Sequence, residues 1–173
     1  MLGKDYAGQH CALARALELV GERWTLLIVR DAFYGVRRFS DFAARLDIPR
    51  AVLSDRLAGL VTAGLLARTP DCRRPGRDLY ELTDDGQALW PALHALASWG
   101  TRFFDGPAPR QFAHDGCGRP LDEHGTCPRC GQTPGPTAIV TSLHGPPARD
   151  DPVTAALRPR RHLLDPLTTG TGP

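Results

Sequence analysis

The sequence predicts a mainly α-helical protein with one small β-hairpin, an α+β fold, followed by a short Cys-rich segment. Three observations support this prediction. Apolar residues recur at helical spacing through most of residues 10–104, the period changes to that of short strands after Gly64, and three of the five Cys lie within residues 105–132. We therefore expect one domain over 10–104, a Cys-rich segment over 105–132, and a Pro-rich, largely disordered tail over 133–173.

The tail is expected to be disordered because of its composition. It contains eight Pro in 41 positions and little periodic apolar pattern. Such a segment buries too little apolar surface to offset the conformational entropy that is lost on ordering.

Length and composition restrict the classes of protein to which the chain can belong. Its 173 residues fit one domain with appendages, and the net charge is only +2. No apolar run approaches the roughly 18 residues that span a bilayer, and the N-terminus lacks the apolar core of a signal peptide. We therefore expect a cytoplasmic protein without membrane contact. In such a chain five Cys, an odd number, favour reactive or metal-binding thiols over a disulfide scaffold.

Two helices are predicted at the start of the domain, over residues 10–20 and 24–34. In the first, Leu13, Leu17 and Val20 recur at i, i+4 and i+7 and form one apolar stripe. The second is a nearly continuous apolar run. A glycine follows each helix and is the expected stop signal.

A pair of helices joined by a short break is predicted next. Ser40 is a credible N-cap for a helix over residues 41–46, residues 47–49 form a tight break, and a longer helix follows over residues 50–63. The buried stripe of the longer helix consists of apolar residues at helical spacing, namely Leu53, Leu57, Leu60 and Val61.

After this pair the pattern changes to that of a hairpin and a final helix. Short strands are predicted over residues 65–69 and 78–83, on either side of a loop, residues 70–77, that contains two Pro, one Gly and three Arg. Thr83 then caps a long helix over about 84–104. Apolar residues cover more than one face of this helix, which favours burial against a partner subunit.

Two consecutive helices followed by a hairpin are the element order of a winged helix-turn-helix. In that fold a short helix supports a second helix, which presents one face to the major groove of DNA, and the hairpin loop reaches the flanking backbone or minor groove. The charge distribution supports this interpretation, because residues 35–77 contain nine Arg and four Asp, a local charge of +5. The alternative is a solvated surface on which the Arg residues pair with neighbouring carboxylates.

We predict the DNA contacts from the face of the second helix that lies opposite its buried stripe. Base edges are assigned to Arg50, Ala51, Ser54 and Asp55, phosphates to Arg37, Arg38 and Arg56, and the minor groove or its flank to Arg73, Arg74 and Arg77. Asp55 is the discordant member. A carboxylate repels phosphate and is useful only if it accepts a hydrogen bond from a cytosine amino group.

Five motifs occur in order along residues 10–104: the helix at Cys11, GERWTLLIVRDAFYG, RRFSDF, LSDRL and YELTDDG. In this order they resemble the HxlR family of bacterial winged-helix transcription regulators. The resemblance implies a homodimer that is assembled through the first and last helices and binds a pseudo-palindromic operator. Two positions depart from the family pattern, Pro49 where Ser or Thr is common and Asp55 where an amide or basic residue is usual. Both affect the expected operator sequence and not DNA binding as such.

Cys11 is a candidate redox-sensing residue. It lies at the predicted start of the first helix, where the helix dipole and nearby Arg15 favour the thiolate. The resemblance adds that some family members sense oxidants or electrophiles through a Cys at this place. The alternative is a small buried apolar residue.

The Cys-rich segment contains two short motifs that resemble the knuckles of a zinc ribbon. His114 and Cys117 are separated by two residues, as are Cys127 and Cys130, and a glycine follows each pair. This spacing allows two ligands to bind one tetrahedral ion from a tight turn, and the glycine permits the left-handed step that ends the turn. The sequence therefore predicts one structural zinc per subunit, with His124 as an alternative to His114. A redox-active dithiol is the competing interpretation of the two later Cys.

No catalytic set is apparent outside the Cys cluster, so we do not expect an enzyme. The leading hypothesis is a homodimeric repressor that a small-molecule or thiol-reactive signal releases from its operator. A cavity for an apolar effector between the first and last helices, or simply the dimer core, would be lined by Trp24, Leu27, Ile28, Leu93, Leu96 and Trp99. The alternatives are a protein-interaction module that uses the Cys-rich segment and a CxxC dithiol redox protein.

Overall fold

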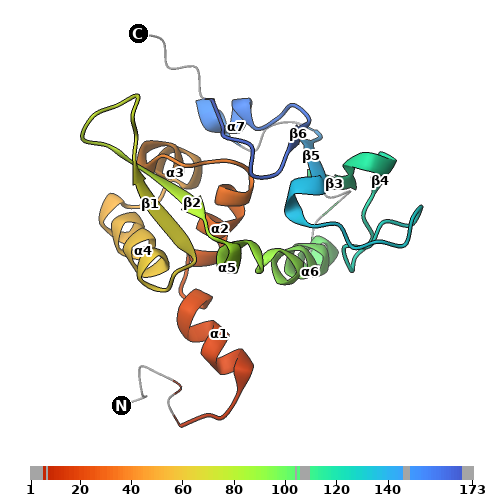
Figure 1. Cartoon of the computed structure of the whole chain (residues 1–173), viewed down its shortest axis with the longest axis horizontal. Helices are drawn as coiled ribbons and strands as arrows, with labels where there is room; N and C mark the ends of the chain where they lie inside the picture. Colours follow the sequence, from red (N-terminus) through yellow and green to blue (C-terminus); the bar gives the residue numbers. More distant parts are fainter. Residues whose placement is uncertain (1–5, 7, 104, 106–109, 146–148, 169–173) are drawn as a thin grey trace.

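The computed structural model describes residue 6 and residues 8–103, 105, 110–145 and 149–168. The chain forms two packed parts, a helical part that carries a hairpin and a smaller sheet module (Figure 1). The helical part begins with α1 (Ala12–Val20), α2 (Thr25–Phe33), α3 (Phe39–Leu46) and α4 (Arg50–Thr62), and continues into the hairpin of β1 (Leu66–Pro70) and β2 (Asp78–Leu82). The two strands pair antiparallel, with Leu66 opposite Leu82. The predicted winged helix-turn-helix, mainly α with a small hairpin, is confirmed.

The core of the helical part forms around α2. Side chains of α2 and α4 with almost no exposed surface meet there, namely Ile28, Val29, Phe33, Leu53, Leu57 and Leu60. Val61, the last member of the predicted α4 stripe, is only partly buried. Because apolar burial is the main favourable term in folding, this contact fixes the position of α4 against the rest of the chain.

Helix α3 begins earlier than the sequence predicts. The backbone N–H groups of Asp41 and Phe42 both donate to the Arg38 carbonyl oxygen, at 3.0 and 3.1 Å, so Arg38 takes the N-cap position. Ser40 lies inside the first turn, and its Oγ contacts the Asp41 carboxylate at 3.3 Å instead of capping the helix. The prediction of Ser40 as N-cap is wrong, because the hydrogen bonds of the first turn start two residues before it.

Two helices, α5 (Asp84–Gln87) and α6 (Trp90–Gly100), replace the single helix predicted over 84–104. Pro91 explains the interruption, because its ring has no N–H and would clash with the preceding turn of a continuous helix. Thr83 caps α5 as predicted, and its Oγ1 accepts a hydrogen bond from the Gly86 N–H at 3.1 Å. A 3-10 turn, Thr101–Phe103, follows α6, and the predicted helix end at residue 104 lies outside the described residues.

The second part is an antiparallel sheet in the order β4-β3-β5-β6. Its elements are β3 (Arg110–His114), β4 (Arg119–Pro120), β5 (Ile139–Leu143), α7 (Pro152–Ala156) and β6 (Arg161–His162), with 3-10 turns over Asp115–Cys117 and Pro136–Ala138. β3 pairs with β5 along its whole length, from Arg110 opposite Leu143 to His114 opposite Ile139. The predicted Cys-rich segment and tail are therefore joined in one sheet.

The expectation of a largely disordered tail is wrong for residues 133–145 and 149–168, which are ordered in this structure. Ile139, Leu157 and Leu163 are buried and belong to the same apolar core as α2. The tail finds on the helical part the apolar contacts that it lacks in its own composition, and composition alone cannot reveal such a partner surface. The remaining tail residues, 146–148 and 169–173, lie outside the described part of the chain.

Backbone hydrogen bonds fix the end of the tail against the turn that follows α2. The Leu164 N–H donates to the Phe33 carbonyl at 2.7 Å, and the Leu167 N–H donates to the Gly35 carbonyl at 2.9 Å. Gly35 has φ +89°, and a Cβ at this position would lie 1.8 Å from the Asp165 carbonyl oxygen. Only glycine therefore allows the tail to approach so closely.

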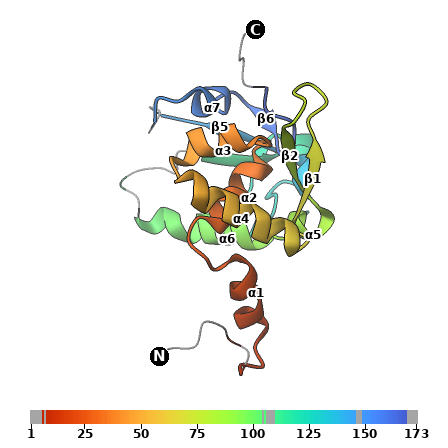
Figure 2. The same ribbon diagram turned by 90° about the vertical axis from the view of Figure 1, so that its left-hand side faces the viewer.

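α1 stands apart from the rest of the chain in two perpendicular views (Figures 1 and 2). Ala14 and Val20 are its buried residues, whereas Leu13, Leu17 and Leu19 are exposed. No helix in the described residues is long and apolar enough to cross a bilayer.

Candidate nucleic-acid interface and metal cluster

The outward face of α4 lies opposite its buried stripe. Ala51, Ser54 and Asp55 are exposed there, and Arg50 is exposed at the first residue of the helix. The Arg50 guanidinium lies over the ring of Phe39, 5.3 Å from the ring centroid, which holds it at the junction of α3 and α4. The predicted base-edge residues therefore share one accessible face.

The start of α4 has the geometry of an uncapped helix terminus. Pro49 occupies the N-cap position and has no side chain that could accept a hydrogen bond from the first turn. The first backbone N–H groups of a helix have no intrahelical acceptor, and they carry the positive end of the helix dipole.

All three Arg residues predicted to contact phosphate pair with a carboxylate of the chain, and the partner of Arg38 is Asp71. Arg37 forms an ion pair with Glu81, and its Nη2 donates to the Leu164 carbonyl oxygen at 3.1 Å. Arg56 Nη2 donates to the Glu22 carboxylate at 2.9 Å. At all three positions the structure contains the carboxylate pairing that is the alternative to a phosphate-binding surface.

Asp71 organises the wing loop, and the sequence analysis did not single it out. Its Oδ1 accepts a hydrogen bond from the Arg73 N–H at 2.9 Å, its Oδ2 accepts one from Arg38 Nε at 3.2 Å, and its own N–H donates to the Arg77 carbonyl at 2.8 Å. Burial alone would raise the pKa of Asp71, but the hydrogen bonds from the Arg73 N–H and Arg38 outweigh burial and lower its pKa below the usual value. Asp at the first position of a turn was the available sequence signal.

The Arg residues of the wing differ in exposure. Arg73 and Arg77 are exposed and Arg74 is half-buried. At the base of the wing, Arg68 Nε of β1 donates to the Asp78 carboxylate of β2 at 2.8 Å. Several Arg residues are paired with carboxylates in this way. The positive charge that faces solvent is therefore confined to fewer residues than the net charge of +5 for residues 35–77 suggests.

Four side chains of the sheet module come together as the sequence predicts. The ligand atoms of His114, Cys117, Cys127 and Cys130 all lie within 4.8 Å of one another, and Cys130 Sγ lies 3.4 Å from His114 Nδ1. His114 ends β3, Cys117 lies in the turn that follows, and the other two come from the loop between β4 and β5. Three thiols and an imidazole at this separation form a donor set that suits tetrahedral Zn²⁺.

The two knuckles have the predicted turn geometry. Gly118 has φ +61° and Gly131 has φ +71°. The Gly118 N–H donates to the His114 carbonyl at 2.8 Å, and the Gly131 N–H donates to the Cys127 carbonyl at 2.9 Å. The left-handed glycine closes each turn and allows both side chains of a pair to point to the same place.

The environment of the thiols differs within the cluster. Burial would raise the pKa of Cys127, but backbone N–H groups of Cys130 and Arg129 outweigh burial and lower its pKa to about 6. A hydrogen bond to Cys130 is the main reason that the pKa of Cys117 is raised to about 11. A bound cation would therefore have to displace a proton from Cys117.

His124 is not part of this cluster. It is exposed, and its Nε2 lies 3.6 Å from the Glu123 carboxylate. The alternative in which His124 replaces His114 as a ligand is wrong, because His114 and not His124 lies together with the three thiols.

Cys11 occupies the N-cap position of α1 and is exposed. The alternative of a small buried apolar residue is therefore wrong for the single chain. Arg15, which the sequence placed near the thiol, pairs with the Glu18 carboxylate at 3.1 Å. The positive charge of Arg15 is therefore paired with a carboxylate one turn further along the helix.

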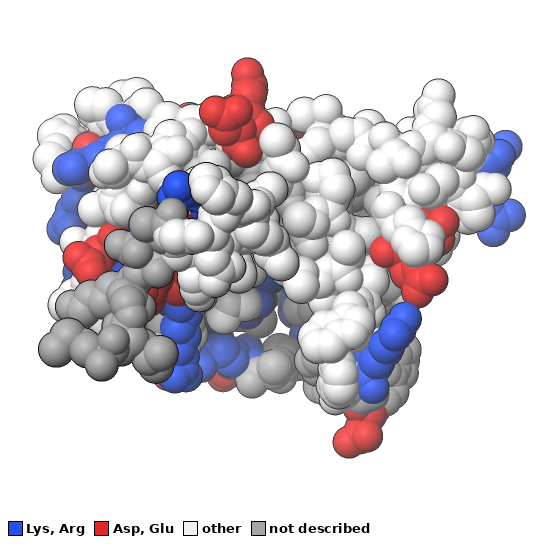
Figure 3. Space-filling view, turned by 90° about the horizontal axis from the view of Figure 1, so that it is seen from below, with Lys and Arg blue, Asp and Glu red and all other residues white. Residues whose placement is uncertain are grey.

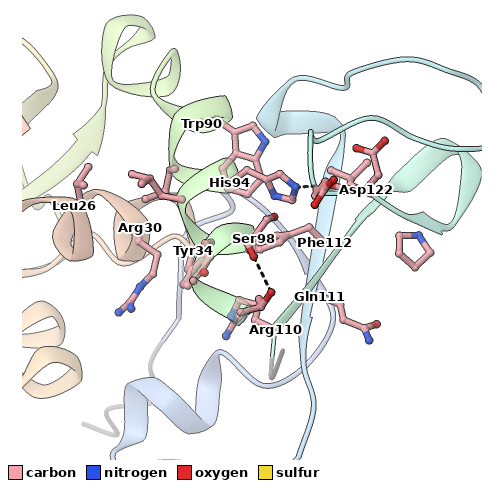
Figure 4. Close-up of a pocket in the computed structure, with 18 of the residues that line it drawn as sticks. Leu26, Arg30, Tyr34, Trp90, His94, Ser98, Arg110, Gln111, Phe112 and Asp122 are labelled. Carbon is pink, nitrogen blue, oxygen red and sulfur yellow. Dashed lines mark hydrogen bonds between the residues drawn. The ribbon is translucent and has the colours of Figure 1, made fainter. Parts of the chain in front are cut away.

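The apolar residues predicted for a cavity or dimer core separate into different environments. Three of them line a cavity of about 820 Å³, namely Leu27, Leu93 and Leu96. Ile28 is fully buried in the core, Trp24 is partly buried against it, and the exposed Trp99 packs on Phe103 with ring centroids 4.9 Å apart. The cavity lies between α2, α6 and β3 (Figure 4), and not between the first and last helices, because the sheet module supplies one wall.

Comparisons with known proteins agree with this geometry. The model of the family described as HxlR-like helix-turn-helix matches residues 19–107. An uncharacterised HTH-type transcriptional regulator of Mycobacterium tuberculosis is 46% identical over 123 residues, which cover 70% of this chain and 78% of the relative. The HTH-type transcriptional regulator YodB of Bacillus subtilis is 28% identical over 89 residues, 51% of this chain and 80% of YodB.

Two solved structures are similar to this chain. PA1607, a candidate transcription factor, aligns with a TM-score of 0.52 and 35% identity over 65% of this chain and 89% of its own. The redox regulator HypR in its oxidised form aligns with a TM-score of 0.51 and 25% identity over 56% of this chain and all of its own. The family match ends at residue 107, before β3 begins.

Replacing Asp71 by Asn should destabilise the protein most at neutral pH. A carboxylate whose pKa is lowered by folding contributes stability that is present above the ordinary Asp pKa of about 3.9 and is lost as the pH falls through the lowered value. The difference in urea midpoint between wild type and Asp71→Asn should therefore be clear at pH 7 and shrink at about pH 3. The exposed Asp150 serves as the control, since Asp150→Asn should leave the midpoint unchanged. A difference that is the same at both pH values contradicts this account of the wing.

Proposed function

This chain belongs to the HxlR-like helix-turn-helix family and is a transcriptional regulator with a helix-turn-helix DNA-binding fold, and we propose that it is a homodimeric repressor of a pseudo-palindromic operator. One observation carries the proposal. The face of α4 opposite the core is exposed and stands beside the basic wing, as Figure 2 shows with α4 toward the viewer. An exposed helix of this kind fits the major groove, while a neighbouring wing reaches the flanking DNA.

The contacts of α4 are proposed from their position on the helix. Arg50, Ala51, Ser54 and Asp55 would face base edges, with Arg50 suited to guanine and Asp55 to a cytosine amino group. Pro49 leaves the first-turn N–H groups of α4 without a side-chain cap. These groups are proposed to meet a phosphate, as helix N-termini commonly do.

The proposed phosphate contacts are compatible with the ion pairs in the free chain. An Arg guanidinium has five N–H donors, and one carboxylate uses only part of them. The pairs of Arg37, Arg38 and Arg56 would therefore orient each guanidinium while leaving donors for DNA. Arg73, Arg74 and Arg77 would reach the minor groove or its flank from the wing that Asp71 holds in shape.

The exposed apolar residues support dimer formation. Apart from Tyr6, those with large side chains lie on α1, α2, α6 and the 3-10 turn after α6, and they are Leu13, Leu17, Leu19, Leu27, Leu96, Trp99 and Phe103. Figure 3 views the side from which α1 projects, and few charged side chains cover the middle of this side. Many exposed large apolar side chains of this kind are unusual on a monomer. We propose that a second copy of the chain covers this exposed apolar surface, with α1 packing on the partner.

The metal cluster is proposed to hold one structural zinc. His114, Cys117, Cys127 and Cys130 would supply the four ligands, and their grouping within 4.8 Å supports a metal over a simple dithiol. Bound zinc would supply folding free energy by cross-linking the turn after β3 to the loop before β5. No catalytic function is assigned to it.

The signal that releases the protein from its operator is proposed to act on the helical surface that forms the proposed dimer. Cys11 is exposed at the start of α1, so a thiol-reactive compound can reach it in the single chain. HypR, which shares the fold, is a redox regulator. Modification of Cys11 would alter the start of α1 and with it the spacing of the two α4 helices, whereas a small-molecule effector would act through the cavity beside α6.

The DNA-binding proposal is tested by selecting bound duplexes from a random pool. We expect one pseudo-palindromic motif, and Arg50→Ala should weaken binding to it by about 1–3 kcal/mol with relaxed preference at one base pair. The control is Arg119→Ala, because Arg119 is exposed on β4 at the opposite end of the molecule from α4 (Figure 1). Absence of any selected motif, or binding that does not weaken with salt, would contradict the proposal and favour a protein-interaction module.

The dimer proposal predicts that one charge in the apolar surface separates the subunits. Leu17→Glu places a carboxylate on the exposed face of α1 and should convert a dimer into a monomer, because an unpaired charge is costly in a buried interface. Light scattering coupled to gel filtration measures the mass directly. Ala155→Glu, on exposed α7, should leave a dimer. A wild-type monomer at micromolar concentration would overturn the proposal.

The zinc proposal predicts one zinc ion per subunit in protein purified without added metal. Cys130→Ser should lower the zinc content well below one ion per subunit, whereas Cys72→Ser, in the wing, should leave it unchanged. Removal of the metal by a chelator should also lower the melting temperature. A wild-type zinc content far below one per subunit would contradict the assignment.

A further inference from the structure

The cavity between the helical part and the sheet module has the size and lining of a ligand site. Its volume of about 820 Å³ lies within the range of small-molecule pockets, roughly 300–1,000 Å³. α2 and α6 form one side, and β3 with the loop after β4 forms the other. Both parts of the chain must therefore be in place for the cavity to exist.

One end of the cavity is aromatic and apolar. Trp90 and Phe112 pack edge to face with ring centroids 5.0 Å apart, and Leu26, Leu93 and Leu121 are further apolar residues of the cavity lining. Figure 4 shows Trp90 and His94 on α6 at the upper side of the site. This surface suits the flat or branched hydrocarbon body of a ligand.

The other end carries two guanidinium groups. Arg110 lies over the ring of Tyr34 at 4.3 Å from its centroid, and Arg30 approaches the same ring at 5.9 Å. In Figure 4 both Arg residues lie near Tyr34, on the lower side of the site. The planar groups are held by stacking and can bind a carboxylate through paired N–H donors.

The charged groups beside this end of the cavity carry more positive than negative charge. Asp31 is fully buried and pairs with Arg30 at 2.8 Å and with Arg45 at 3.9 Å. Arg110 donates to two neutral oxygens, Thr141 Oγ1 and the Leu157 carbonyl, each at 3.2 Å, and no described carboxylate lies within 4 Å of it. Three cations thus share one anion.

Burial is the largest cause that lowers the pKa of Arg110, while the neighbouring charges act in both directions: Tyr34 and Asp31 raise the pKa, and repulsion from Arg45 and Arg30 lowers it. An added anion at this end would therefore be stabilised by the excess positive charge. A neutral molecule of the same shape would not gain this interaction.

Acidic groups occupy the opposite rim. Asp122 accepts hydrogen bonds from the N–H groups of His124 and Thr126, and Glu123 lies 3.9 Å from Arg102. Both carboxylates repel an anion, so they favour a single orientation in which the ligand's charge lies toward Arg30 and Arg110.

We propose that this cavity binds a small carboxylic acid with an aromatic or branched apolar body, its carboxylate at Arg30 and Arg110 and its body against Trp90 and Phe112. The proposal rests on the proposed function and names the chemical class of its effector. Because α6 also carries Leu96 and Trp99 of the exposed apolar surface, a ligand that changes the packing of α6 would change the proposed dimer.

The test compares two probes of the same shape on the full-length protein. Isothermal titration calorimetry at neutral pH measures 2-naphthoate, which is ionised, and 2-naphthamide, which is neutral. We expect naphthoate to bind about tenfold or more tightly, as one charge-assisted pair of hydrogen bonds requires. Equal affinities, or no binding of naphthoate at millimolar concentration, would overturn the proposal, and neither result depends on a variant that folds.

Two substitutions locate the effect. Arg110→Gln should remove most of the preference for naphthoate over naphthamide, whereas Arg119→Gln, on the exposed edge of the sheet, should keep it. Circular dichroism verifies that each variant is folded. A preference that persists in folded Arg110→Gln contradicts the assigned carboxylate position.

Binding of a protein segment in the same cavity is a separate outcome. If naphthoate binds only to monomeric Leu17→Glu protein, a second copy fills the site in the dimer and the proposal fails.

DNA affinity is measured separately by fluorescence anisotropy. Loss of naphthoate selectivity with intact DNA binding rejects only the effector site, whereas absence of DNA binding rejects the proposed function and leaves the calorimetric comparison valid.

Discussion

The burial of α2 is the constraint on which the rest of the structure depends. A helix that is apolar on most of its surface must be covered on every side. α3 and α4 cover one side, and the end of the tail covers another through the hydrogen bond from the Leu164 N–H to the Phe33 carbonyl. The helix that is proposed to read DNA and the module that carries the metal cluster are therefore fixed to the same central element.

Electrostatics impose a second organisation on this scaffold. The Arg residues between positions 35 and 77 are numerous, but several of them hold the chain together. Arg45 donates to Thr154 of α7 at 2.7 Å and faces the buried Asp31, while Arg37 joins β2 to the tail. Arg50, Arg73 and Arg77 remain exposed. The proposed DNA surface thus combines exposed guanidinium groups with Arg37, Arg38 and Arg56, which also pair within the chain, and the total charge of the segment does not define it.

The metal cluster shows how far local sequence can specify a site. Two residues between ligands and a glycine after each pair are local features, and they were sufficient to predict all four side chains and both left-handed turns. Asp71 shows the limit of such reasoning. Its position in a turn was visible, but its contact with Arg38 depends on how the wing folds back onto the start of α3.

By itself, the sequence determined α2 to α4, the hairpin and the ligand quartet, because helical periodicity, strand boundaries and ligand spacing are properties of neighbouring residues. Only the tertiary structure decided that the tail is ordered and that the cavity forms against β3. The break between α5 and α6 at Pro91 is a local effect that the sequence already contained, but the apolar periodicity of the final helix masked it. The order of the tail and the cavity depend on apolar surfaces and charges that meet from distant parts of the chain, and no local pattern specifies which surfaces will meet.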